Sequence, residues 1–141
     1  IVFESRKKAA TAAAELEGAL GERFGYGARV LIVTTEHLQS VVDAGSGTGN
    51  AAAIPGYRVA GKTGTAQELS SNGITASFVG VVPADAPQVV VGVFVTNPRT
   101  SVYGGVVAAP VFADVAGFTL ASLGVAPSDT SAAPALYPTT W

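Results

Sequence analysis

Three stretches between residues 57 and 96 have the hydrophobic and polar patterns of strands. Residues 57–66 alternate with a period of two, which is typical of a strand. The stretches at 76–82 (ASFVGVV) and 88–96 (QVVVGVFVT) are short, apolar and rich in β-branched residues. Because short turns at 70–73 and 83–87 separate them, we expect an antiparallel three-stranded meander. The third stretch is apolar on both faces, so we expect it to be central in the sheet.

A helical period follows the meander. Val111, Val115 and Phe118 fall on one face of residues 106–123, and Gly124 is a typical residue to end such a helix. We expect this helix to cover one face of the sheet and to bury these three side chains against it.

The first third of the chain has a different order of elements. Ser5 is a good N-cap for a helix in which Ala13, Leu16, Leu20 and Phe24 share one face. Apolar stretches before and after it favour strands, and Thr35 can cap a second helix. The predicted order is β-α-β-α, with elements at residues 1–4, about 6–24, 28–34 and 36–43.

These elements predict an α+β chain with three parts. The glycine-rich residues 45–50 interrupt the pattern and suggest an internal boundary. We therefore expect a β-α-β-α segment at 1–44, the sheet and its covering helix at 45–125, and an extended tail at 126–141. The tail is rich in Pro, Ser, Thr and Ala.

Composition narrows the classes of function. The net charge of the 141 residues is −2, whereas a nucleic-acid surface needs a basic face, so we expect no nucleic-acid partner. The absence of cysteine excludes disulfides and thiolate chemistry. No apolar run reaches the roughly 18 residues of a membrane-spanning helix, and we find no signal peptide. Because the chain begins at Ile1 rather than methionine, we interpret it as a piece of a longer protein.

No group of residues predicts a metal or cofactor. His37 has no second ligand or nucleophile near it in the sequence, and Asp85, Asp114 and Asp129 form no carboxylate pair. We therefore expect neither a metal site nor a cofactor.

The chemistry of the chain is concentrated in residues 56–67, GYRVAGKTGTAQ. On a strand, Lys62 and Gly64 lie on one face, and Gly61, Thr63 and Thr65 lie on the other. A strand that presents an ammonium, two hydroxyls and free backbone N–H groups suits an anionic, peptide-like ligand. Such a ligand can add to an unpaired outer edge as a further strand, with its carboxylate held by Lys62.

The same residues allow a second interpretation. Residues 56–63 satisfy the phosphate-binding pattern G-x-x-x-x-G-K-[ST]. That loop requires a strand before its first glycine and a helix that begins at the lysine. Gly64 and the turn at 70–73 leave no room for a full helix, so nucleotide binding is the weaker alternative.

Residues 45–141 resemble the C-terminal part of the transpeptidase domain of class B penicillin-binding proteins, of the actinobacterial cell-division type. The matching residues run in the family's order: Gly47-Thr48-Gly49, 59–67 (VAGKTGTAQ), 77–80 (SFVG), Val93-Phe94-Val95, Asn97-Pro98, Gly104-Gly105 and 108–112 (AAPVF). Residues 1–44 instead resemble part of an unrelated small bacterial family of unknown function. The two resemblances together imply a junction of two unrelated fragments, natural or artificial.

The resemblance implies a fragment of the penicillin-binding and serine β-lactamase fold. It implies that Lys62 gives the nucleophile region positive potential, that Thr63, Gly64 and Thr65 bind the substrate carboxylate, and that the Thr65 N–H is an oxyanion donor. The implied reaction is serine acyl transfer between D-Ala-D-Ala stem peptides of peptidoglycan, with β-lactams as inhibitors. Other cell-division proteins are implied partners, and the implied location is the outer side of the bacterial plasma membrane.

Two motifs of the family have no convincing counterpart. The nucleophile motif Ser-x-x-Lys has its spacing in Ser5-Arg6-Lys7-Lys8, and Ser-x-Asn has its spacing in Ser70-Ser71-Asn72. The first begins an amphipathic helix in a charged cluster, and the second follows the lysine motif in a turn. We therefore expect this chain alone to be inactive. The competing hypothesis is a non-catalytic chimeric protein in which the lysine strand is only structural.

Overall fold

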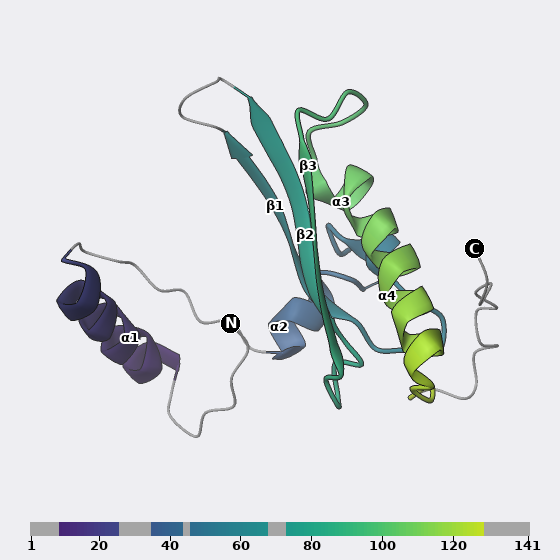
Figure 1. The fold of residues 1–141 in the computed structure, drawn as a ribbon, viewed down its shortest axis with the longest axis horizontal. Coiled ribbons are helices and arrows are strands. Elements are labelled where there is room, and N and C mark those ends of the chain that lie inside the picture. Colours follow the sequence, from purple (N-terminus) through teal and green to yellow (C-terminus); the bar gives the residue numbers. More distant parts are fainter. Residues whose placement is uncertain (1–8, 26–34, 44–45, 68–72, 129–141) are drawn as a thin grey trace. The chain divides into compact units, whose positions relative to one another are not determined.

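The computed structural model describes residues 9–25, 35–43, 46–67 and 73–128 (Figure 1). The chain divides into two compact units, Ile1–Thr34 and Thr35–Trp141. The described part of the first unit is helix α1 (Ala9–Phe24), which confirms the helix expected after Ser5. The strands expected at 1–4 and 28–34 lie outside the described residues.

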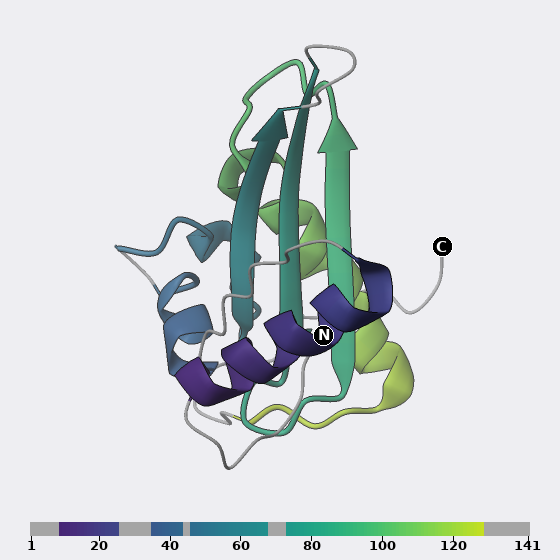
Figure 2. The same ribbon diagram turned by 90° about the vertical axis from the view of Figure 1, so that its left-hand side faces the viewer.

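The second unit contains a three-stranded antiparallel sheet in the order β1-β2-β3. Figure 2 shows the three strands side by side, with α4 behind them. This arrangement confirms the predicted α+β class and the meander. The elements of the unit are α2 (Thr35–Ser40), the 3-10 turn η1 (Asn50–Ala52), β1 (Ala60–Gln67), β2 (Ile74–Val82), β3 (Val89–Thr96), α3 (Gly104–Val107) and α4 (Ala109–Leu123). None of the helices in the described ranges has the length and apolar character needed to cross a membrane.

The prediction that β3 is the central strand is wrong. The central strand is β2, and β3 lies at one edge of the described sheet. Side chains along β3 alternate between half-buried and exposed, and Val90 and Phe94 are 62% and 67% exposed. One face of β3 is therefore packed, and the other is apolar but has no covering element among the described residues.

The register of β1 against β2 assigns each side chain to a face. Thr63 lies opposite Phe78, and Lys62 lies opposite Val79. Phe78 is fully buried in the core with Phe112 of α4, so Thr63 shares the α4 face of the sheet. Lys62 consequently points to the opposite face, as the period of two predicted. Gly61 also lies on the α4 face, where a Cβ atom would collide with the Phe78 ring.

Helix α4 covers one face of the sheet (Figure 1), but it buries a different set of side chains from the one predicted. Val111 and Val115 are 44% and 45% exposed, and Phe118 is only half-buried. The fully buried residues are Ala109, Phe112, Ala116 and Leu120. Phe112 fills the space above Gly80, where a Cβ atom would come within 2.7 Å of its ring. Small residues at Ala109 and Ala116 then let the helix approach closely.

The other face of the sheet is covered at one end by α2. Leu38 of α2 packs against the buried side chains of Ala60, Val81 and Ala84. The compact unit that holds the sheet therefore begins at Thr35. The tail predicted from residue 126 is described only to Ser128, whose hydroxyl donates a hydrogen bond to Asp85 Oδ1 at 3.1 Å.

Candidate functional site

The candidate site is built on β1, an edge strand. Its outer side has no partner strand among the described residues, so its outward backbone groups are open to an extended ligand. The strand begins at Ala60, three residues later than the alternating pattern predicted. A tight turn occupies the preceding residues, because the Tyr57 N–H donates to the Ile54 carbonyl at 3.0 Å and Gly56 has a φ of +82°.

Lys62 is the one charged residue in the three described strands. Its side chain is exposed, and its Nζ donates a hydrogen bond to the Thr63 carbonyl oxygen at 2.9 Å. The ammonium therefore lies beside the β1 backbone, and the three described strands carry no other ionic side chain. An anion that approaches this strand finds one concentrated positive charge.

The two threonines of the motif line a pocket of about 340 Å³. The Thr63 Oγ1 lies 3.2 Å from the Thr48 Oγ1, and the Thr65 hydroxyl donates to the Val102 carbonyl at 3.1 Å. The complete lining is Thr48, Thr63, Gly64, Thr65, Tyr103, Gly104, Gly105 and Val106. Three of the four predicted site residues therefore meet in one pocket, whereas Lys62 is not in its lining.

Two glycines bring α3 against the strands and so form the far wall of the pocket. A Cβ atom at Gly104 would collide with the Ser77 carbonyl, and one at Gly105 would collide with the Thr48 carbonyl. Glycine is therefore required at both positions for this close approach. In the sequence, the Gly-Gly pair was recognised only as part of the family resemblance, and Tyr103 and Val106 were not predicted as lining residues. The pair of adjacent glycines was the signal that could have found this wall.

The structure gives no position for either candidate nucleophile motif. Ser5 and residues 70–72 lie outside the described residues. His37 is exposed on α2, and no cluster of three or more potential metal ligands occurs within the described ranges.

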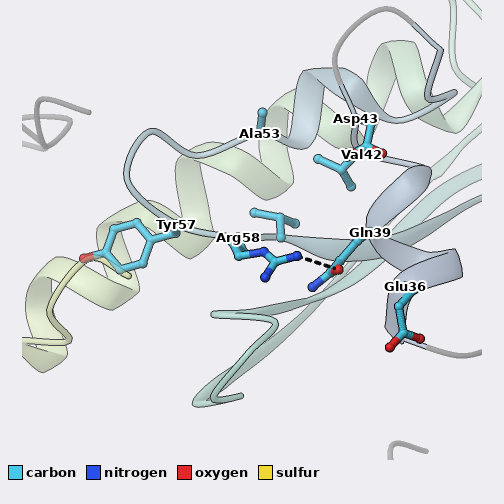
Figure 3. Close-up of a pocket in the computed structure, with 8 residues that line it drawn as sticks. Glu36, Gln39, Val42, Asp43, Ala53, Tyr57 and Arg58 are labelled. Atoms are coloured by element: carbon cyan, nitrogen blue, oxygen red, sulfur yellow. Dashed lines mark hydrogen bonds between the residues drawn. The ribbon is translucent and has the colours of Figure 1, made fainter. Parts of the chain in front are cut away.

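A second pocket, of about 330 Å³, lies between α2 and the segment that precedes β1 (Figure 3). Arg58 donates a hydrogen bond to Gln39 Oε1 at 3.0 Å across it. The Tyr57 hydroxyl is turned away and donates to the Val125 carbonyl at 2.6 Å. None of the four predicted site residues lines this pocket, so it is distinct from the hydroxyl-lined one.

The structure also argues against the phosphate-loop interpretation of residues 56–63. Lys62 is the third residue of β1, and the strand continues to Gln67. No helix begins at the lysine, so helical N–H groups that could bind a phosphate at this position are missing.

Comparison with known proteins matches residues 30–117 to the family described as "Penicillin binding protein transpeptidase domain". The chain belongs to this family. It is 46% identical over 96 residues to stage V sporulation protein D of Bacillus subtilis, and 39% identical over 105 residues to a probable peptidoglycan D,D-transpeptidase, PbpC, of Pseudomonas aeruginosa. These matches cover 64% and 70% of the chain.

Solved structures agree with the family assignment. The transpeptidase domain of penicillin-binding protein 3 from Burkholderia pseudomallei is 44% identical to this chain, with a TM-score of 0.59. The match covers 67% of this chain but only 30% of that domain. The chain likewise spans 15% of the Bacillus relative and 18% of the Pseudomonas relative. It therefore corresponds to a minor part of each relative.

The family match begins at residue 30, so it includes α2 and starts before the glycine-rich stretch at 45–50. Residues 1–29 lie outside it. The resemblance of the N-terminal part to a second bacterial family stays a prediction.

Proposed function

We propose that this chain forms the carboxylate-binding wall of a peptidoglycan D,D-transpeptidase site. The observation that carries the proposal is the position of the Lys-Thr-Gly-Thr run on an unpaired edge strand, with both threonines lining a pocket. Membership of the transpeptidase family supports it, since relatives such as FtsI of Escherichia coli are named peptidoglycan D,D-transpeptidases.

In this proposal the stem peptide adds to the outer edge of β1 as a further strand. Main-chain hydrogen bonds give it affinity and register. Its terminal carboxylate enters the pocket between Thr63 and Gly105, where hydroxyl donors can bind it. The Lys62 ammonium lies on the opposite face of β1, at the Thr63 carbonyl, and supplies the countercharge across the strand.

The chemistry in this proposal is acyl transfer. A serine oxygen attacks the carbonyl carbon between the two D-alanines, the C–N bond breaks, and the terminal D-alanine leaves with a proton on its amine. The amine of a second peptide then attacks the acyl-enzyme and releases the serine. The Thr65 backbone N–H serves as a donor to the oxyanion, a role for which one fixed donor contributes roughly 10²- to 10³-fold in rate.

The serine belongs to a part of the site that the described residues do not supply. We therefore propose that catalysis and acylation by β-lactams require the remainder of a transpeptidase domain, of which this chain corresponds to about a third. By the same reasoning we propose the outer side of the bacterial plasma membrane as its place of action, with other cell-division proteins as partners.

A binding measurement tests the proposal on the chain itself. N-acetyl-D-Ala-D-Ala should shift the amide resonances of β1 and of Thr48, Gly104 and Gly105 in a saturable NMR titration. The matched ligand is the C-terminal amide of the same peptide, which has no carboxylate and should shift them far less. Equal binding of acid and amide, or binding that leaves β1 unchanged, would favour a strand with a purely structural role.

A further inference from the structure

The hydroxyls of Thr48 and Thr63 meet although the residues lie 15 positions apart in the chain. Their Oγ1 atoms are 3.2 Å apart, and both residues line the same pocket. Thr48 lies in the Gly-Thr-Gly segment before η1, and Thr63 lies on the α4 face of β1. The pair therefore joins two separate segments at the wall of the candidate site.

The backbone around Thr48 is fixed on both sides. The Gly47 N–H donates to the Asp43 carbonyl at 3.1 Å, and the Gly49 N–H donates to the Val41 carbonyl at 2.8 Å. Gly105 packs directly against the Thr48 carbonyl. These contacts fix the backbone of Thr48, whose side chain is exposed, and so hold its hydroxyl within reach of Thr63.

The two threonines of the motif, Thr63 and Thr65, differ in where their hydroxyl protons can go. A hydroxyl has one proton to donate and two lone pairs that accept. Thr65 donates its proton to the Val102 carbonyl, so in this arrangement that proton is not available to a ligand. If Thr48 donates to Thr63, then the Thr63 proton stays free to point into the pocket. A donor that also accepts a hydrogen bond is polarised and becomes a stronger donor.

We propose that Thr48 is a positioning residue, which donates to Thr63 Oγ1 and so directs the Thr63 proton at the substrate carboxylate. The inference rests on the proposed function of the same pocket. Thr65 has the different task of holding the loop at Val102 through its hydroxyl. Among the threonines that line the pocket, Thr63 is thus the hydroxyl donor to the ligand, and the Thr48 hydroxyl lies behind it.

The test compares the intact chain with Thr48→Val and Thr48→Ser in the titration with N-acetyl-D-Ala-D-Ala. Valine keeps the shape without the hydroxyl, and serine keeps the hydroxyl. We expect Thr48→Val to weaken binding by about 3- to 10-fold, the loss typical of one hydrogen bond. Thr48→Ser and the control Thr119→Val should bind like the original chain, because Thr119 donates to Val115 within α4. Unchanged binding by Thr48→Val, or equal loss in Thr48→Ser, would overturn the proposal.

A second measurement needs no ligand. Three-bond NMR couplings report the χ1 rotamer of Thr63, which should be single in the original chain and in Thr48→Ser and averaged in Thr48→Val. An unchanged single rotamer in Thr48→Val would overturn the positioning role. If the original chain binds no peptide, the proposed function fails, while the rotamer comparison still decides whether Thr48 orients Thr63.

Discussion

The rings of Phe78 and Phe112 meet edge to face, with centroids 4.8 Å apart and an angle of 61° between their planes. Both side chains are fully buried, and they join the centre of the sheet to α4. This contact lies behind Gly61, which places the strand that carries Lys62 directly on the core. The geometry of the candidate site therefore depends on the packing of α4.

Substitution of Phe112 tests this dependence. Phe112→Ala should lower the free energy of unfolding by about 3–5 kcal/mol, because it removes a buried ring and leaves a cavity. Val115→Ala is the matched control on the same helix. Since Val115 is 45% exposed, its loss should change stability by no more than about 0.5–1 kcal/mol. Urea unfolding followed by circular dichroism measures both, and a larger loss for Val115→Ala would contradict the observed helix phase.

A second prediction concerns β-lactams. This chain alone should form no covalent adduct with penicillin, because no credible serine with a lysine base accompanies the Lys-Thr-Gly-Thr run. Intact-mass spectrometry after incubation provides the measurement. A mass increase of one opened β-lactam that disappears in Ser5→Ala would identify Ser5 as the nucleophile and would contradict the prediction.

Nucleotides provide a third test. The chain should show no micromolar binding of ATP with Mg²⁺ in calorimetry, because Lys62 lies within β1 and does not begin a helix. Lys62→Ala serves as the comparison. If the chain binds ATP with measurable heat and Lys62→Ala abolishes that binding, the phosphate-loop interpretation would be restored.

The strands and their order in the chain could be predicted from sequence, because alternation and short turns are local signals. Residues 57–67 show both the strand and the residues of the motif. The central position of β2 could not be predicted in this way. A run such as VVVGVFVT shows that both faces are apolar, but it does not show which face has a covering element.

The phase of α4 and the pocket depend on tertiary contacts. Val111 and Val115 are more hydrophobic than Ala116, so the sequence favours the valines as the buried positions. Ala116 faces the sheet instead, because the helix must approach closely around Phe112. The pairing of Thr48 with Thr63 joins positions that no local period connects. Sequence reasoning found three of the lining residues by motif and missed the wall formed by α3.

A chimeric transpeptidase tests the central proposal most directly. Residues 30–117 of this chain would replace the matching segment of the Burkholderia pseudomallei domain, which is 44% identical and supplies the remainder of the fold. Two variants of the chimera would be compared, Lys62→Ala and the control Arg58→Ala, whose guanidinium bonds Gln39 outside the candidate site.

The measurement is the rate of labelling by a fluorescent penicillin. We expect the chimera and its Arg58→Ala variant to be acylated at similar rates, and Lys62→Ala to be acylated at least about 100-fold more slowly, as expected when a preorganised charge is removed from an acyl-transfer site. A folded chimera that takes no label, or a Lys62→Ala variant labelled as fast as its parent, would contradict the assignment of this strand to a transpeptidase site.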